Sequence, residues 1–338
     1  MENKLKNSEK HTLTIAMLAV LSAVFAFLSA LIGELFVPAT AAALAALYLY
    51  DTSKNRLTSI LISTAVILLS TVVAVLIASY SFILGVEAVL LAAVAAVCYS
   101  GGVSKSATVL FTTAVSVVMV VASLLVMPMI AQSSLSFDAV STFYETLYGL
   151  LREEFVASFD VLMQSVSVEN LKIELTAEDA VQIFDAALHM LISLVIIAGF
   201  VIAGLTVKLF CAFVKRLDAD TKRVSEWRFV TPSTYANFYL ILSVLNLFMS
   251  SVSDILGITV ANLYLVFMFV YAYVGIKLIY NHFGEHNSKA VVAFLVLVIL
   301  VCLPGTSLQI FSLIGVFYTF YRNKVDSGDF SGFTSNKQ

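Results

Sequence analysis

The chain has 338 residues, of which 60% are hydrophobic and 12% are charged, with a formal net charge of -3 and a mean hydropathy of +0.98. Soluble domains carry about 25% charged residues, so this composition excludes a water-soluble globule and indicates a polytopic membrane protein. The apolar runs are long and continuous, whereas barrel strands alternate over segments of roughly ten residues. The expected fold class is therefore all-α, a bundle of transmembrane helices.

The N-terminal part, residues 1–131, is predicted to form a bundle of five helices. They are expected at about residues 12–36, 39–50, 57–80, 83–100 and 107–131, with Gly101-Gly102 at the turn before the last. The second is too short to cross a hydrocarbon core of roughly 30 Å unaided. It is therefore either re-entrant or extended at the interface by residues 51–56.

Residues 132–184 form a polar, acidic segment with only two basic residues, Arg152 and Lys172. Spacings of three and four place apolar residues on one helical stripe, namely Val140, Phe143, Leu147, Leu151, Phe155 and Phe159. The opposite face carries Glu145, Glu153, Glu154 and Asp160. We expect an amphipathic helical segment outside the membrane, lying either on the lipid surface or on the bundle.

A second helix is predicted to start near the end of this acidic segment. Thr176 and Asp179 have the spacing of a capping box, in which Asp replaces the usual Glu. The pattern predicts that this helix runs into the next membrane span, at about residues 185–212.

The C-terminal part, residues 185–325, is predicted to form five more membrane helices. They are expected at about residues 185–212, 234–252, 258–280, 289–303 and 306–321, with a turn at Pro304-Gly305. Trp227 and Arg228 are expected to anchor the main loop at the membrane interface. The polar tail, residues 326–338, is expected to be disordered.

The positive charges report how these ten helices cross the membrane. Seventeen of the 19 Lys and Arg residues fall in alternate loops on one side of the membrane. The two exceptions are Arg152 and Lys172. Cytoplasmic loops retain Lys and Arg because their transfer across the bilayer is unfavourable. Both termini are therefore expected in the cytoplasm.

Motifs for common catalytic chemistry are absent from the sequence. It contains no G-x-x-x-x-G-K-[ST], H-E-x-x-H or G-x-S-x-G motif, which disfavours a P-loop nucleotide site, a zinc protease site and a nucleophile elbow. Cys98, Cys211 and Cys302 lack metal-ligand spacing and suit packing positions. We expect no enzyme, no cofactor, no bound metal and no nucleic-acid partner.

The strongest candidate for a ligand-binding residue is Glu87, which lies inside an apolar helix near the outer interface. An ionisable group within a membrane span is costly and indicates function by default, although a snorkelling or protonated carboxylate is the alternative. Glu34 stands at the outer end of the first helix, as either a site residue or a solvated loop acid. If the two carboxylates share a cavity, they would hold a cation or a polar substrate.

Further polar and aromatic residues are predicted to lie in the outer half of the bundle. They are His189, Asp254, Asn262, Tyr264 and Gln309. As a set they would line a cup that opens outward. Each of the polar residues alone has a simpler interpretation as a packing hydrogen bond or a solvated helix end, and Tyr264 alone as an interfacial or packed ring.

Small residues recur along the first helix at Ala19, Ala23, Ala26 and Ala30. Stripes of small residues let membrane helices approach closely. The stripe either packs within the bundle or forms a contact face for another membrane subunit.

The Ala-rich first helix, the short second helix and the Gly101-Gly102 turn resemble the substrate-binding S component of energy-coupling-factor vitamin transporters. The whole chain resembles the YybS-like family of uncharacterised bacterial membrane proteins (a domain of unknown function), whose members often carry a Trp-Arg-x-Pro element. Here the stretch from Trp227 to Pro232 has two extra residues before the proline. The resemblance implies a ligand site near Glu34 to Pro38 and a coupling subunit that contacts the alanine stripe.

Two functions follow as hypotheses for a multi-pass protein of the bacterial cytoplasmic membrane. The first is a transport-related protein that binds a small solute from outside and depends on a membrane coupling subunit and an ATPase. The second is a non-transporting scaffold or assembly factor of the cell envelope, with the acidic outer segment and the basic inner loop as contact surfaces. A cavity lined by Glu34 and Glu87 would favour the first.

Overall fold

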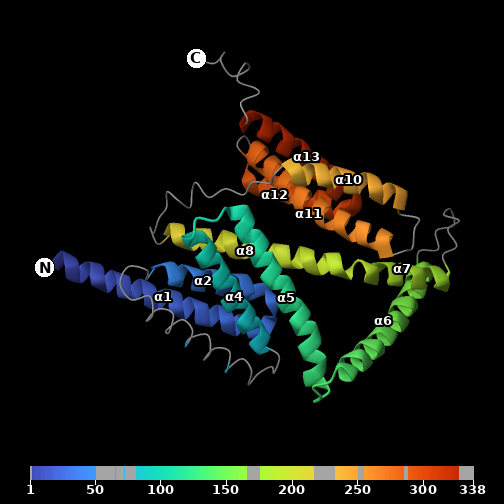
Figure 1. The fold of residues 1–338 in the computed structure, drawn as a ribbon, viewed down its shortest axis with the longest axis horizontal. Helices are drawn as coiled ribbons and strands as arrows, with labels where there is room; N and C mark the ends of the chain where they lie inside the picture. Colours follow the sequence, from blue (N-terminus) through green and yellow to red (C-terminus); the bar gives the residue numbers. More distant parts are fainter. Residues whose placement is uncertain are drawn as a thin grey trace, which may run out of the picture. The chain divides into compact units, whose positions relative to one another are not determined.

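The computed structural model describes residues 2–50, 81–165, 176–216, 233–249, 255–284 and 288–326, together with the single positions 65 and 72. Within these ranges the secondary structure is helical and contains no strand (Figure 1). Most of the predicted helix at 57–80 lies outside the described residues, as do Trp227, Arg228, Asp254 and the tail from residue 327.

The described helices follow the predicted order closely. They are α1 (Glu2–Ile32), the 3-10 helix η1 (Glu34–Phe36), α2 (Val37–Tyr50), α4 (Ser81–Ser100), α5 (Lys105–Ala131), α6 (Phe137–Ser165), α7 (Ala177–His189), α8 (Leu191–Arg216), α10 (Ser233–Met249), α11 (Ile255–Gly284), α12 (Lys289–Cys302) and α13 (Pro304–Asp326). The all-helical fold class is thereby confirmed for this part of the chain.

Among the described residues, four helices are long and apolar enough to cross a membrane. They are Phe82–Ser100 in α4, Lys105–Ala131, Leu191–Arg216 and Ile255–Gly284. Shorter apolar helices occupy Leu13–Ser29, Glu34–Leu49, Ser233–Met249 and Lys289–Cys302. The total of ten spans and the sidedness of the loops stay predictions.

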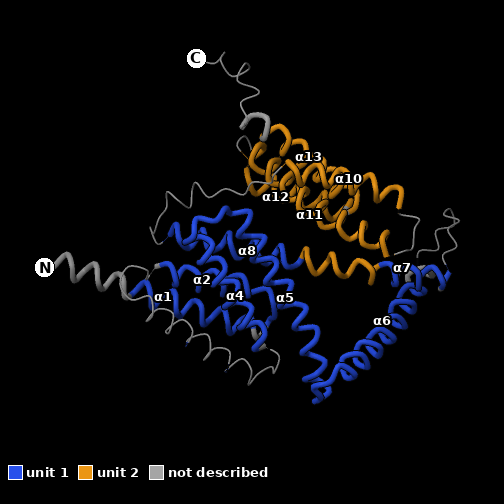
Figure 2. The backbone as a smooth tube through the Cα atoms, in the orientation of Figure 1, with its two compact units in different colours: residues 1–186, 198–229 blue, residues 187–197, 230–338 orange. Residues whose placement is uncertain are grey.

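The chain divides into two compact units (Figure 2). Unit 1 comprises Met1–Ala186 and Ala198–Phe229, and unit 2 comprises Ala187–Ile197 and Val230–Gln338. This division passes through α8, whereas the sequence places a boundary at residue 185. The division predicted from the sequence, into segments with boundaries at about residues 131, 184 and 325, is based on polarity and membrane sidedness and stays a prediction.

Unit 1 is built around α2, which packs against both α1 and α4. Every residue from Ala41 to Leu47 is at most 1% exposed, so the short helix is enclosed by protein. Its alanines let the neighbouring helices approach closely. A hydroxyl contact of 3.3 Å between Ser29 Oγ and Thr40 Oγ1 joins α1 to α2.

The predicted turn at Gly101-Gly102 is confirmed, and it ends α4 with a Schellman motif. Gly102 has a φ of +76°, which glycine adopts without a Cβ penalty. The amide of Gly102 donates to the Tyr99 carbonyl at 3.2 Å, and that of Val103 donates to the Cys98 carbonyl at 2.9 Å, as the motif requires. Ser104 then caps α5 through its hydroxyl, which accepts from the Ala107 amide at 3.3 Å.

The acidic segment contains the predicted amphipathic helix as α6, followed by α7. Phe184 of α7 packs against Tyr148 and Phe155 of α6, with ring centroids 5.7 and 5.5 Å apart. The Tyr148 hydroxyl donates to Asp185 Oδ1 at 2.9 Å. The four acidic residues of the predicted polar face are exposed. The apolar stripe of α6 therefore packs in part on protein.

The helix predicted to run from Thr176 into the next span is interrupted at Met190, between α7 and α8. In an unbroken helix the Ser193 amide would donate to the His189 carbonyl four residues earlier. Here Ser193 N donates to Asn262 Oδ1 at 3.2 Å, and Asn262 Nδ2 donates to the His189 carbonyl at 2.9 Å. The side chain of Asn262 therefore bridges the missing helical bond.

In unit 2, α11 packs against α10, α12 and α13. Gly275 and Gly315 face each other where α11 and α13 cross, since a Cβ built at Gly275 would lie 3.1 Å from the Gly315 amide nitrogen and would overlap the Phe311 carbonyl oxygen. A Cβ at Gly315 would likewise overlap the Tyr271 carbonyl oxygen. At this crossing the backbones of α11 and α13 are in direct contact.

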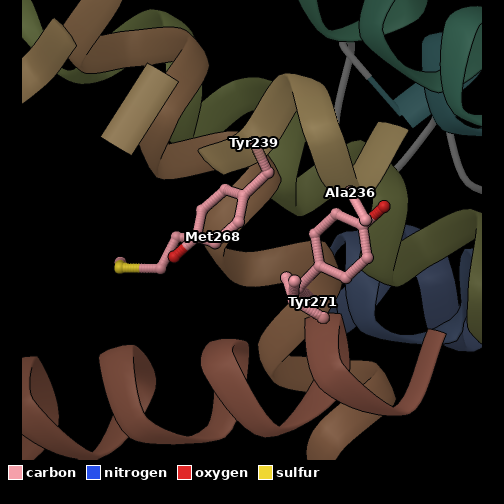
Figure 3. Packing of buried hydrophobic residues seen from close by; sticks show 5 residues of the cluster. Ala236, Tyr239, Met268 and Tyr271 are labelled. Carbon is pink, nitrogen blue, oxygen red and sulfur yellow. The ribbon is translucent and has the colours of Figure 1, made fainter. Parts of the chain in front are cut away.

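Beside the crossing lies a buried cluster formed by Ala236, Tyr239, Met268, Tyr271 and Val316. Figure 3 shows the rings of Tyr239 and Tyr271 next to Ala236 and Met268. The centroids of the two rings are 5.5 Å apart. The cluster joins α10 to α11 and α13, so it sets the packing of three helices in unit 2.

We predict that Gly275→Ala lowers the free energy of unfolding by about 1–3 kcal/mol, the usual cost of overpacking. The added methyl group has no space between the two backbones, so α11 and α13 must separate. The matched control is Gly204→Ala, because no heavy atom lies within 4 Å of a Cβ at that position. Thermal unfolding in detergent checks both variants, and equal midpoints would contradict the close crossing.

The capping box at the start of α7 predicts a pH dependence. The Thr176 amide and hydroxyl both donate to Asp179 Oδ2 at 2.7 Å, and these bonds hold the pKa of Asp179 below its usual value. The cap's contribution to stability is therefore present at neutral pH. This contribution is lost as the pH falls from about 3.9, the pKa of an ordinary aspartate, through the lower pKa of Asp179 in the folded protein.

The chemical shift of the Thr176 amide proton, followed by NMR in micelles, measures this titration. Its midpoint should lie below that of an ordinary aspartate. Asp179→Asn should remove the titration, whereas Glu178→Gln, the neighbouring acidic residue, should leave it in place.

Candidate functional site

Glu87 lies on α4, at the contact with α5, and its side chain is 2% exposed. Ser116, on α5, donates its hydroxyl proton to Glu87 Oε1 at 2.7 Å, and Ser116 is itself fully buried. On α4 the neighbouring Ala88 and Leu91 are also buried. The carboxyl group predicted as the main site residue therefore lies in an apolar helix interface with a hydroxyl partner.

Glu34, the second predicted carboxylate, is exposed on η1. Its charge lies close enough to act electrostatically on the Glu87 carboxyl. Gly33, with a φ of +91°, precedes η1 and lets the chain turn between α1 and α2. Glu34 and Glu87 both belong to unit 1, with one carboxylate accessible and the other enclosed.

Ser116 belongs to a series of hydroxyl residues that sequence reasoning missed. Thr108, Thr112 and Ser116 are all fully buried, and their spacing of four places them on one face of α5. Thr112 donates to the Thr108 carbonyl at 2.7 Å and Thr108 donates to the Ser104 carbonyl at 3.0 Å. The signal in the sequence was the repeated hydroxyl at every fourth position of an apolar helix.

His189 and Asn262 also lie together, in unit 2. Asn262 is 9% exposed, and its amide makes the two bonds that bridge the α7–α8 break, with a third to the Ile258 carbonyl at 2.9 Å. His189 contributes its backbone carbonyl to this arrangement, and its side chain is exposed. The geometry accounts for Asn262 as the residue that replaces the backbone hydrogen bond lost at the α7–α8 break.

Tyr264 and Gln309 make other contacts within unit 2. The Tyr264 ring is stacked on Tyr239, with centroids 5.7 Å apart and an interplanar angle of 7°. The Gln309 carbonyl accepts from the Ser312 hydroxyl at 2.7 Å, while the Gln309 side chain is exposed. These residues belong to unit 2, and Glu34 and Glu87 belong to unit 1. A single cup lined by all the predicted residues stays a prediction.

The alanine stripe of α1 is partly covered within the chain itself. Ala19 and Ala26 are each 9% exposed, Ala23 is half-buried, and the side chain of Ala30 lies outside the described residues. Because α1 packs on α2 and α4, Ala19 and Ala26 serve this internal packing. The exposed face of α1 is formed by larger residues, Met17, Val20, Val24 and Phe27.

The described residues contain no group of three or more His, Cys, Asp and Glu side chains arranged to hold a metal ion. At Glu87 the described residues provide one enclosed carboxylate, which accepts a hydrogen bond from the Ser116 hydroxyl, and Glu34 adds a second negative charge.

Asn262 was predicted to contact a ligand, whereas the structure shows it as a bridge between backbone groups. The free energy of unfolding of an Asn262 variant tests the bridge. If it is the bridge, Asn262→Ala should lower the free energy of unfolding by roughly 1–2 kcal/mol, given about 0.6 kcal/mol per hydrogen bond between membrane helices. His189→Ala should change it by less than about 0.5 kcal/mol, because only the backbone of His189 takes part. Denaturation in mixed micelles measures both variants, and a stable Asn262→Ala would contradict the bridge.

The sequence matches one known family along nearly its whole length. The family described as "Predicted membrane protein (DUF2232)" covers residues 9–317. No curated protein and no solved structure matches the chain significantly. With its long apolar helices and this match across most of the sequence, the chain belongs to the family of predicted membrane proteins DUF2232.

Proposed function

We propose that this protein binds a small solute from the extracytoplasmic side of a bacterial cytoplasmic membrane as part of a transport process. The observation that carries the proposal is the enclosed carboxyl group of Glu87 in a membrane-spanning helix. Such a group is expensive in an apolar environment, and those that occur commonly mark substrate or ion pathways. Its hydroxyl partner Ser116 and the nearby exposed Glu34 support a site that communicates with the outer face.

The proposed topology has ten spans with both termini in the cytoplasm, as the distribution of Lys and Arg predicts. In this orientation η1 lies at the outer face, and the outer end of α4 is its N-terminus. Glu87 follows Ser81 by six residues, or about 9 Å along the helix. The carboxyl group would then lie below the outer interface, within reach of a solute that enters beside Glu34.

A transporter of this kind needs a partner, since the sequence has no P-loop for ATP. The resemblance to S components suggests a membrane coupling subunit and an ATPase, and no catalytic activity for this chain alone. Because Ala19 and Ala26 are covered by the chain's own helices, we propose that such a subunit contacts α1 through Met17, Val20, Val24 and Phe27, which are exposed. These residues recur at intervals of three and four along one face.

The alternative is a non-transporting scaffold of the cell envelope, and α6 is the observation that favours it. This helix exposes apolar residues, including Leu150 at 60% and Val161 at 67%, beside the acidic residues of its polar face. Exposed apolar area next to charge is typical of a protein contact surface. In this reading the enclosed Glu87 has a structural role only.

A thermal-shift screen in detergent separates the two functions. The panel contains vitamins, nucleobases, amino acids and metal ions, at constant salt. A solute that binds only the folded protein should raise its stability by about 2.7 kcal/mol at a hundredfold excess over the dissociation constant. Glu87→Gln should remove this shift, because Gln keeps the shape of the side chain and loses the charge.

The control is Glu153→Gln, which changes an exposed carboxylate on α6 and should preserve the shift. The comparison uses the ligand-induced shift of each variant, so a small change in its own stability does not affect the result. A ligand-induced shift that persists in Glu87→Gln would remove Glu87 from the site. No shift with any solute would favour the scaffold, for which crosslinking would then seek partners.

A further inference from the structure

Pro128 interrupts the hydrogen bonding inside α5. It is a buried residue in the last turn of this helix, which ends at Ala131. Proline has no N–H group to donate to the carbonyl four residues earlier, and its ring crowds that carbonyl. The carbonyl of Leu124 therefore loses its helical donor. In or near a membrane such a group is costly unless another donor reaches it.

The missing donor comes from the next helix. The Tyr144 hydroxyl of α6 donates to the Leu124 carbonyl at 2.5 Å, across twenty positions of the sequence. Ala139 and Val140, in the first turn of α6, are buried, and α5 packs against α6. Beyond this contact the two helices diverge (Figure 1). The hydroxyl of Tyr144 thus replaces the missing amide bond and joins the start of α6 to α5.

The corner between the two helices is closed by hydrogen bonds of its own. The Ser134 amide donates to the Met129 carbonyl at 3.0 Å, and Ser133, with a φ of +51°, takes the left-handed position of this Schellman motif. The Ser136 hydroxyl caps α6 by accepting a hydrogen bond of 3.2 Å from an amide of its first turn. The backbone of the corner is therefore fixed, and the weak point of the chain lies before it, at Pro128.

This weak point lies where α5 is expected to leave the membrane. The helix has 27 residues, or about 40 Å, whereas the hydrocarbon core is roughly 30 Å thick and takes about twenty residues to cross. An upright helix that enters at Lys105 reaches the opposite interface just after Leu124. Leu124 is 39% exposed and Tyr144 is half-buried. Water can therefore replace either partner, which makes the bond inexpensive to open.

We propose that Pro128 is a hinge in α5 and that the Tyr144 hydroxyl is the latch of this hinge. While the bond to Leu124 is made, the start of α6 stays docked on α5. When the bond opens, the last turn of α5, the closed corner and α6 move together about residues 124–128. The acidic face of α6 thereby changes its position relative to a membrane-spanning helix. This movement does not depend on solute binding at Glu87.

Amide hydrogen exchange of the purified full-length protein in detergent measures the opening of the latch. Tyr144→Phe keeps the ring and removes the hydroxyl. Exchange in residues 125–145 should then become about three- to tenfold faster, the effect of one hydrogen bond on an opening equilibrium. Tyr148→Phe is the matched control, because the Tyr148 hydroxyl, one turn further along α6, donates to Asp185 of α7. This control should keep the wild-type rates in residues 125–145.

Pro128→Ala tests whether the hinge and the latch act as a pair. Alanine supplies the amide that the Leu124 carbonyl lacks, so the end of α5 should hold without the hydroxyl. Adding Tyr144→Phe to Pro128→Ala should therefore change the exchange rates by less than about twofold, because the two residues are coupled. An equal effect of Tyr144→Phe with and without Pro128→Ala would overturn the pairing.

A distance across the hinge tests the movement itself. Spin labels are attached at Val118→Cys in α5 and Val161→Cys in α6, both of which are exposed positions. The exposed Cys302 is changed to Ser, and the other two cysteines are buried. The protein with an intact latch should give one narrow distance distribution, and Tyr144→Phe should broaden it. Combining Tyr144→Phe with Pro128→Ala should restore the narrow distribution.

Three results would overturn the proposal. The first is the same distance distribution with and without Tyr144→Phe, since the hydroxyl would then hold nothing in place. The second is equal broadening by Tyr144→Phe and Tyr148→Phe, which would assign the effect to general loosening of α6. The third is broadening that persists with Pro128→Ala, because the movement would then occur in the corner and the hinge at Pro128 would be wrong.

Discussion

In a lipid bilayer every polar group must find its partner inside the protein, because the surrounding hydrocarbon offers none. This constraint explains why the described backbone is helical, since helices satisfy their own amides and carbonyls. It also governs the polar side chains. Buried Ser and Thr residues of α1 and α5 donate to backbone carbonyls of their own helices, and Ser116 donates to Glu87. The candidate site is the place where this rule brings a carboxyl group into the interior.

Helices in a membrane associate through close packing, because lipid provides no strong hydrophobic force between them. Small side chains make this close packing possible. In unit 1 the alanines of α2 allow it to lie enclosed between α1 and α4. In unit 2 the same role falls to Gly275 and Gly315, where two backbones touch. Dispersion contacts at such crossings are individually weak, but close approach makes many of them at once.

Asn262, on α11, shows how one polar side chain can stabilise a break between two other helices. Its amide replaces a helical hydrogen bond at the α7–α8 break, so the change of helix direction leaves neither backbone group unsatisfied. The bridge lies at the start of α8, one of the helices that are long and apolar enough to cross a membrane. A residue of α11 thus satisfies the backbone groups that the helix break would otherwise leave without partners.

Hydropathy and periodicity were sufficient to predict the helical class, the turn at Gly101-Gly102, the amphipathic α6 and the start of α7 at Thr176. These features depend on local preferences and on the membrane as a solvent, which act on short stretches of chain. Glu87 also stood out in the sequence as a candidate, because an acidic residue in an apolar run is conspicuous by itself. It did not identify Ser116 as the partner, the break at Met190 or the contact between Gly275 and Gly315. Each of these depends on residues 29 to 73 positions apart, and only the tertiary packing of the helices decides which of them meet.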